Sequence, residues 1–189
     1  MLNEHDKQNI LSRFPNVERS YDKSLHNNVQ INQCKLFMIV PKGPKTYLWY
    51  TYLGSSNVCI IMQTNNKGAF SRIEIQPMCF NDEISYGTIL YGTLITIGSH
   101  EYFTTENILQ YCGDYLHKYS IYKKLDILKE LFDTKISQVA YNKRFIIPTI
   151  PYLCNNFDDA INTSTSLKYT VYGIKCFNDK CIGIYHVRK

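Results

Sequence analysis

The sequence predicts an α+β protein that is mainly antiparallel β-sheet with one long amphipathic helix. Two observations predict this class. Runs rich in Val, Ile, Tyr and Phe alternate with hairpin-length loops rich in Gly, Asn and Ser, which is typical of antiparallel strands. The segment 121–136 instead places Leu125, Leu128, Leu131 and Phe132 on one helical face. Elements of these two kinds are expected to pack as layers around a core.

The first half of the chain is expected to contain one short helix and a series of strands. The helix covers residues 4–14 and ends before Pro15, and an irregular polar stretch follows. The expected strands are 34–40, 46–53, 57–64, 70–77, 87–97 and 100–111. Short loops join the second, third and fourth of these, which predicts an antiparallel meander.

The second half is expected to end in a hairpin. After the long helix, residues 141–157 form an irregular crossing segment with a short strand, and a short helix begins at Phe157. Residues 166–178 and 180–189 then pair around a turn. The length of 189 residues suits one domain, with a helical and irregular N-terminal arm, 1–33, and a core, 34–189.

Charge and cysteine usage give weak indications of partner and compartment. The net charge of +5 favours a polyanionic partner, although the 21 Lys and Arg are scattered along the chain. The seven cysteines, without a signal peptide or an apolar span, predict reduced thiols inside a cell and no membrane association. Cys176 and Cys181 are closely spaced, with His186 nearby, but zinc needs four ligands, so buried free cysteines are favoured and no metal is expected.

Recognisable catalytic groups are scarce. The five His lie mostly in polar stretches, and no Ser or Cys has an evident neighbouring base. The acidic residues are expected in loops and on the outer face of the long helix, not as pairs on strands.

The repeated tripeptide in YGTILYGTLI, residues 86–95, raises the possibility of a phosphate-binding loop. Gly87 and Gly92 lie among β-forming residues and no helix follows, so this possibility is rejected. A spacing of five residues would place Tyr86 and Tyr91 on opposite faces of a strand, so the repeat itself carries no meaning.

Four short motifs nevertheless follow one another in a recognisable order. They are Lys42-Gly43-Pro44-Lys45, Thr88-Ile89-Leu90-Tyr91-Gly92-Thr93-Leu94, Phe103-Thr104-Thr105-Glu106-Asn107-Ile108-Leu109 with Gly113, and Tyr172-Gly173-Ile174. This order resembles the nucleotidyltransferase fold of mRNA guanylyltransferases, DNA and RNA ligases and the cap-binding domain of snurportin. The chain is also similar to uncharacterised proteins of large nucleocytoplasmic DNA viruses. The resemblance implies a nucleotidyltransferase, or ATP-grasp-like ligase adenylation, fold without an OB domain.

The motifs depart from those of the enzymes at their acidic positions. The resemblance places residues of the Asp-Gly, Asp-Gly-Glu, Asp and Glu-Gly motifs at five positions that hold other residues in this chain. These positions are Pro44, Tyr91, Thr93, Asn107 and Tyr172. Nucleotidyl transfer needs a neutral lysine nucleophile and carboxylates that hold a divalent metal and the ribose. Lys42 therefore occupies the position of the lysine nucleophile but is not expected to act as one. A shift in register that puts Lys45 at that position restores none of the missing acidic motif residues. No catalytic residue and no cofactor is expected.

A site without carboxylates could still bind a nucleotide. Aromatic rings can stack on a base, and a positively charged methylguanine adds a cation–π attraction. The resemblance implies that the ligand-binding residues for a cap or nucleotide are Lys42, Lys45, Trp49, Tyr91, Thr93, Phe103, Tyr172 and Lys175. Purely structural roles stay open as alternatives. In these, Trp49 is a core residue, the two tyrosines fill the vacated pocket, and Lys42 and Lys45 are solvated charges.

The function predicted on this basis is non-catalytic binding of capped mRNA or RNA in a viral transcription, capping or translation assembly. The other subunits of such an assembly are the possible protein partners, and the host cytoplasm, in a viral factory, or the virion is the expected location. The alternatives are an active mRNA guanylyltransferase or RNA ligase, which requires a covalent lysine–nucleotide adduct, and a purely structural subunit with a filled pocket.

Overall fold

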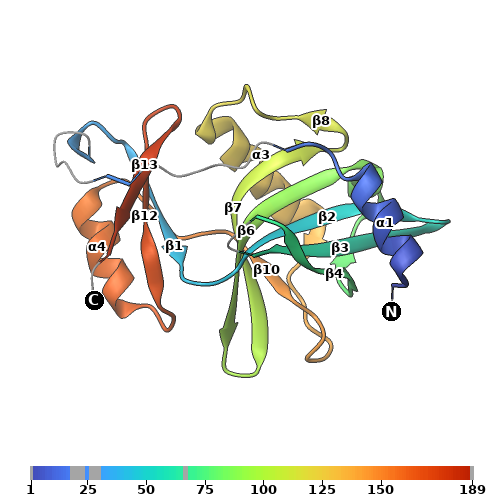
Figure 1. Ribbon diagram of the computed structural model, residues 1–189. Coiled ribbons are helices and arrows are strands. Elements are labelled where there is room, and N and C mark those ends of the chain that lie inside the picture. The colour runs from blue at the N-terminus through green and yellow to red at the C-terminus, as the bar shows by residue number, and fades with distance from the viewer. Residues whose placement is uncertain (1, 18–23, 26–30, 66–67, 188–189) are drawn as a thin grey trace.

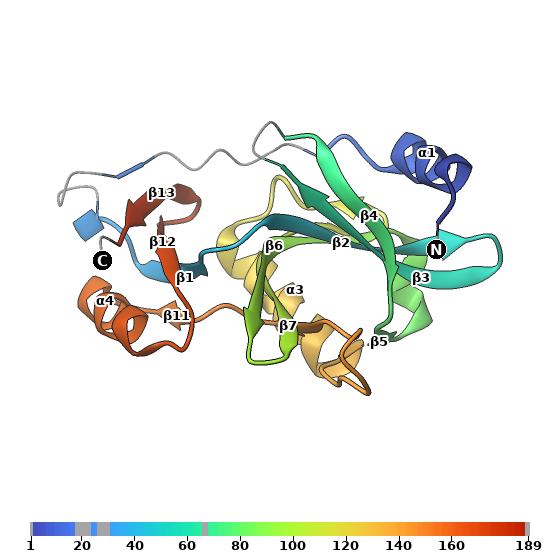
Figure 2. The same cartoon turned by 60° about the horizontal axis from the view of Figure 1, so that its bottom comes forward.

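The computed structural model describes residues 2–17, 24–25, 31–65 and 68–187. It confirms an α+β protein built mainly from antiparallel sheet. The strands form a seven-stranded sheet, a four-stranded sheet and a two-stranded ribbon. Figures 1 and 2 show the two larger sheets as neighbouring lobes.

The large sheet contains the predicted meander and the predicted strands 87–97 and 100–111. Its order is β10-β7-β6-β2-β3-β4, with β8 paired to β7. The strand bounds are β2 (Lys45–Leu53), β3 (Ser56–Thr64), β4 (Phe70–Gln76), β6 (Thr88–Ile97), β7 (His100–Tyr111), β8 (Asp114–Tyr115) and β10 (Ile147–Thr149). The neighbours from β7 to β4 are antiparallel, whereas β10 is parallel to β7.

The small sheet pairs an early strand with the C-terminal hairpin. Its order is β11 (Leu153–Cys154), β1 (Leu36–Pro41), β12 (Val171–Phe177) and β13 (Cys181–His186). The closing hairpin is therefore confirmed. Two further strands that were not predicted, β5 (Cys79–Phe80) and β9 (Ile136–Ser137), form the ribbon.

Three α-helices with bounds in the described part of the chain cover the sheets. They are α1 (Glu4–Arg13), α3 (Ile121–Thr134) and α4 (Phe157–Ser166). Asn3 forms a capping box with Asp6 at the start of α1, and the Ser120 side chain caps α3, which explains where both helices begin. No helix among these described segments is long and apolar enough to cross a membrane.

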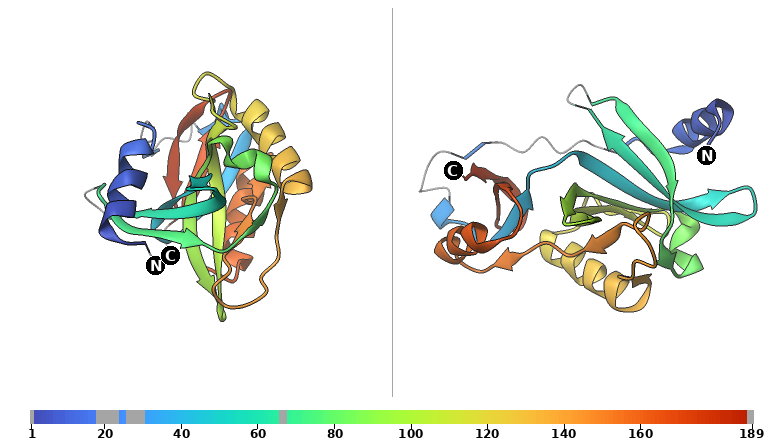
Figure 3. Two further views of the ribbon diagram at one scale, coloured as in Figure 1. Left: turned by 90° about the vertical axis from the view of Figure 1, so that its right-hand side faces the viewer. Right: turned by 90° about the horizontal axis from the view of Figure 1, so that it is seen from below.

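Helices α1 and α3 lie on opposite sides of the large sheet (Figure 3, left). Because side chains alternate along a strand, β2 contributes to two cores. Leu48 and Tyr50 pack in the core that includes Leu128 of α3, whereas Tyr47 and Trp49 pack in the core that includes Ile10 of α1. The expected N-terminal arm thus supplies a covering helix for the sheet.

The two halves of YGTILYGTLI have different structures. Tyr86 ends a 3-10 helix, η1 (Asp82–Tyr86), and Gly87 caps it with a φ of 104°, in the left-handed region that favours glycine. The prediction that both tyrosines lie on one strand was therefore wrong. Gly92 lies within β6, where an added Cβ would be 2.0 Å from the carbonyl oxygen of Thr104. Glycine is required there by the close approach of two backbones.

Candidate ligand-binding site

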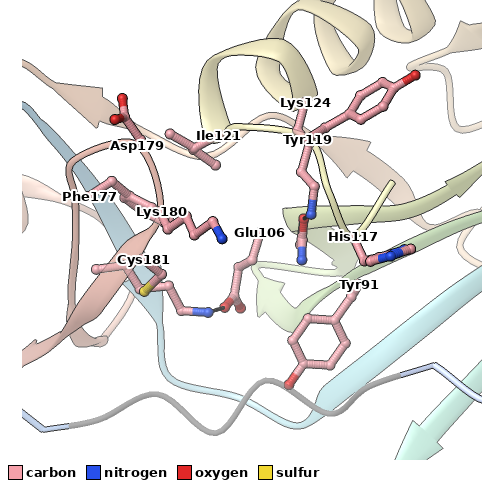
Figure 4. Close-up of a pocket in the computed structure, with 12 residues that line it drawn as sticks. Tyr91, Glu106, His117, Tyr119, Ile121, Lys124, Phe177, Asp179, Lys180 and Cys181 are labelled. Atoms are coloured by element: carbon pink, nitrogen blue, oxygen red, sulfur yellow. Dashed lines mark hydrogen bonds and ion pairs between the residues drawn. The ribbon is translucent and has the colours of Figure 1, made fainter. Parts of the chain in front are cut away.

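A cavity of about 220 Å³ lies where the two sheets and the start of α3 meet. The β12–β13 hairpin contributes Lys175 and Lys180, the large sheet contributes Tyr91 and Glu106, and α3 contributes Lys124. Figure 4 shows the Lys124 and Lys180 side chains extending into this space and the Tyr91 ring at one end of it. The fold therefore collects cations and a ring from segments that are far apart in the sequence.

Glu106 forms the floor of this cavity. Tyr91 pairs with Asn107 and Gly92 pairs with Thr105, so Glu106 is the extra residue of a β-bulge in β7. A bulge re-aims a side chain out of the regular alternation of the strand. Its side chain is fully inaccessible to solvent, so the carboxylate depends entirely on protein partners.

Three side chains from other strands hold this carboxylate. Lys45 Nζ lies 2.5 Å from Glu106 Oε1, and Lys175 Nζ lies 2.9 Å from Oε2. The Thr93 hydroxyl also donates to Oε1 at 2.5 Å, and Lys45 donates to the Thr93 hydroxyl oxygen at 2.8 Å. The network fastens β12 of the small sheet to β2, β6 and β7 of the large sheet.

The network around Glu106 carries a net positive charge when the carboxyl is ionised. Burial by itself would raise the pKa of the Glu106 carboxyl, but the positive charges of Lys175 and Lys45 oppose it. Hydrogen bonds from Lys45 and Thr93 add to their effect, so the pKa lies below its ordinary value. Glu106 is therefore ionised at neutral pH, and two ammonium groups share one carboxylate.

The sequence-based expectation that acids lie only in loops and on the helix exterior was wrong at Glu106. The expectation concerned motif positions, and Glu106 is one residue before Asn107, the position that the resemblance singled out. The available signal was the acid itself, because an ionisable residue inside an otherwise apolar or neutral strand needs a buried partner. The same signal applies to Lys175 in the GIKCF stretch of β12.

A further cation, Lys124, lies at the opposite wall of the cavity. Its Nζ donates to Asn107 Oδ1 at 3.1 Å. Burial lowers the pKa of this amine. Among the described residues no carboxylate pairs with Lys124, so its partner is a neutral amide. Within this part of the chain its positive charge has no ion-pair partner, and Lys124 lines the cavity.

Four of the residues predicted from sequence come together at this site. Lys45, Thr93 and Lys175 surround Glu106, and Tyr91 lines the cavity above them. Lys45 Nζ also lies 6.0 Å from the centre of the Tyr91 ring, a cation–π distance. The resemblance-based choice of these residues therefore converges on one place.

Trp49 and Phe103 lie elsewhere, in the core. Trp49 is 4% exposed, with its ring 5.3 Å from the Phe14 ring and 5.6 Å from the Arg13 guanidinium carbon. Phe103 is completely buried on the α3 side of the large sheet. Neither ring borders the cavity, so Trp49 has the core position considered as its alternative.

Lys42 and Tyr172 also lie outside the cavity. Lys42 is exposed in the turn between β1 and β2, beside a different surface depression that includes Thr170. Tyr172 is 45% exposed, and its ring meets the His186 ring edge-on at 4.9 Å. The space next to Tyr91 therefore stays open instead of being filled by both tyrosines.

Several cavity residues were not predicted from sequence, namely Glu106, Asn107 as a contact for Lys124, His117, Tyr119, Lys124 and Lys180. His117 and Tyr119 come from the segment before α3, and Lys180 comes from the tip of the β12–β13 hairpin. The residue pattern indicated an ordinary surface for both segments, because charged residues at turns and helix starts are common. Only the meeting of the two segments gives them a shared role; the Ile121 amide donates to the Asp179 carbonyl at 3.2 Å.

No group of three or more His, Cys, Asp and Glu side chains in the described part of the chain is placed to hold a metal ion. Comparison with protein-family models and with curated protein sequences finds no match for this chain. The site must therefore be interpreted from its own geometry.

Proposed function

We propose that this protein is a non-catalytic, nucleotidyltransferase-like domain that binds the 5′ end of an RNA in the cavity between its sheets. The single observation that supports this most strongly is the composition of the cavity. Three lysines and a histidine line it against two carboxylates, and Tyr91 supplies a ring face. This combination suits a phosphate next to a nucleobase.

The phosphate is proposed to bind between Lys124 and Lys180. Both side chains extend into the same open space in Figure 4. The amine of Lys124 is partly buried and pairs with no carboxylate of the described residues, so a bound anion would offset the cost of removing it from water. Lys175 is less suited to this role, because Glu106 already engages it.

The base is proposed to stack on Tyr91. The ring is partly buried, and it packs against Tyr47 with ring centroids 5.0 Å apart, which fixes its orientation. A base that stacks on a fixed aromatic face gains about 1–3 kcal/mol. A methylated, positively charged guanine would gain a further cation–π contribution, so capped RNA belongs to the same ligand class.

The arrangement around Lys45 argues against nucleotidyl transfer. A lysine nucleophile must lose its proton, and the ion pair with Glu106 stabilises the charged ammonium form. Glu106 is the carboxylate on the floor of the cavity, and lysines engage both of its oxygens. Lys42, the other candidate nucleophile, lies outside the cavity. We therefore propose binding without covalent chemistry, as part of a viral transcription, capping or translation assembly.

Fluorescence anisotropy with short RNAs tests this proposal. The ligands are one sequence carrying a 5′-triphosphate, a 5′-monophosphate, a methylated cap or a 5′-hydroxyl. We expect tighter binding of the phosphorylated and capped forms, and loss of this preference in Lys124→Met. Lys129→Met, which removes an exposed charge from the same helix, is the matched control.

Two outcomes contradict the proposal. Equal affinity for the four RNAs, or no binding to any of them, would remove the 5′-end site. A covalent product after incubation with labelled GTP or ATP and a divalent cation, detected on a denaturing gel, would establish the enzymatic alternative. If none of the four RNAs binds, the structural-subunit alternative remains.

A further inference from the structure

Beside the cavity, the described segment 114–124 exposes three tyrosines within eight residues. Tyr115 is 54% exposed, Tyr119 is 45% exposed and Tyr122 is 41% exposed. Tyr119 also lines the cavity, so these exposed rings adjoin the proposed binding site. We call residues 114–124 the tyrosine segment. The segment joins β8 to the first turn of α3 (Figure 1).

Cations are interleaved with these rings. His117, Lys118 and Lys123 are exposed, and Asp114 is the one carboxylate of the segment. The aliphatic residues Leu116 and Ile121 are buried. The exposed face is thus made of rings and positive charges with one carboxylate, Asp114.

The backbone below the rings is held in place. The Leu116 amide donates to the Leu109 carbonyl at 3.0 Å, and the Tyr119 amide donates to the Leu116 carbonyl at 3.1 Å. Ser120 caps α3 through the Lys123 amide at 3.3 Å. A platform that is already ordered loses little conformational freedom when a ligand binds.

We propose that the tyrosine segment carries the single-stranded RNA that continues from the end bound in the cavity. Bases stack on the exposed rings in succession, and Lys118 and Lys123 contact the phosphates between them. This is the combination of aromatic faces and basic side chains by which proteins bind single strands without reading their sequence. The inference rests on the proposed function, because the cavity supplies the start of the path.

The test measures how affinity grows with RNA length. Anisotropy titrations use a 5′-phosphorylated dinucleotide and a 5′-phosphorylated decanucleotide of uridine. The variant is the double substitution Tyr115→Ala and Tyr122→Ala, which leaves the cavity residues unchanged. The double substitution Tyr115→Phe and Tyr122→Phe keeps the rings, and Tyr141→Ala, at a 74% exposed tyrosine outside the segment, is a surface control.

We expect the decanucleotide to bind the unmodified protein at least about fivefold more tightly than the dinucleotide, which corresponds to about 1 kcal/mol of stacking. The alanine pair should lose this gain and keep the dinucleotide affinity, whereas the phenylalanine pair and Tyr141→Ala should keep both. Matching thermal unfolding curves establish that the variants are folded.

The remaining outcomes separate the two proposals. Dinucleotide binding with no gain from length, or a gain that the alanine pair keeps, overturns the path and leaves the cavity site standing. Failure of the dinucleotide to bind, with tyrosine-dependent binding of the decanucleotide, overturns the cavity site and leaves the path. Failure of both RNAs to bind overturns both.

Discussion

Replacing Glu106 with glutamine should destabilise this protein far more than the loss of an ordinary ion pair. The substitution keeps the size of the side chain and removes its charge. The Lys175 side chain is only 5% exposed, so its ammonium would lose the buried counter-charge that Glu106 supplies. Breaking a buried ion pair in this way costs about 3–5 kcal/mol. Lys45, with a side chain that is 28% exposed, can turn toward water and adds little.

The expected loss is measurable by urea unfolding followed by circular dichroism. A decrease of about 3–5 kcal/mol in the free energy of unfolding lowers the melting temperature of a chain of this length by about 6–20 °C. Glu74→Gln is the matched control, because Glu74 pairs with Arg72 at 3.1 Å on the surface and such pairs contribute at most about 1 kcal/mol. Equal stability losses in Glu106→Gln and Glu74→Gln would refute the reasoning.

Three further predictions concern the same framework. The folded pKa of Glu106 lies below its ordinary value of 4.5, so the ionised carboxylate stabilises the fold fully above pH 4.5, and this stabilisation is lost as the pH falls through the folded pKa. Urea midpoints measured from neutral to acidic pH should therefore fall less steeply in Glu106→Gln than in the unmodified protein. Parallel profiles of the two proteins would contradict this. Gly92→Ala should cost about 3 kcal/mol or more, because the new Cβ would overlap the Thr104 carbonyl at 2.0 Å; an unchanged urea midpoint would contradict that clash. Trp49→Ala should cost about 3–5 kcal/mol by opening a cavity under Phe14, and the folded variant should bind RNA as the unmodified protein does; weakened RNA binding at full stability would instead make Trp49 a ligand contact.

Sequence pattern was sufficient for most individual elements of this fold. Strands β2, β3, β4, β6 and β7 and helices α1 and α3 lie within one or two residues of their expected bounds, because alternation, helical spacing and turn residues are local signals. The 3-10 helix at Asp82–Tyr86 was missed because the following YGT tripeptide has strand-forming residues on both sides. Short strands such as Leu153–Cys154 carry no pattern long enough to detect.

The division into two sheets could not be predicted from local pattern. The strand Leu36–Pro41 pairs with Val171–Phe177, about 130 residues further along the chain, and nothing in either segment specifies the other. This pairing brings Lys175 to Glu106 and thereby creates the cavity floor. The site residues were found from sequence where a motif order named them, as for Tyr91, and missed where two surface segments meet, as for Lys124.

The family resemblance and the structure lead to different conclusions about which aromatic residues are available to a ligand. Tyr91, Trp49 and Phe103 were equivalent candidates by type, because each offers a flat ring. Their burial separates them: Tyr91 borders open space, whereas the other two rings are covered by neighbouring side chains. Burial depends on which face of a strand is covered by a helix, and α1 is the element that covers Trp49.

The central claim is that the cavity recognises a terminal phosphate through Lys124. The most direct measurement is the ratio of affinities for one RNA with and without a 5′-monophosphate, in the unmodified protein and in Lys124→Met. We expect the unmodified protein to prefer the phosphorylated RNA about tenfold or more, as a charge-assisted contact of about 1.5–3 kcal/mol implies, and Lys124→Met to show no preference. A ratio near one in the unmodified protein, or the same preference in both proteins, would contradict the claim.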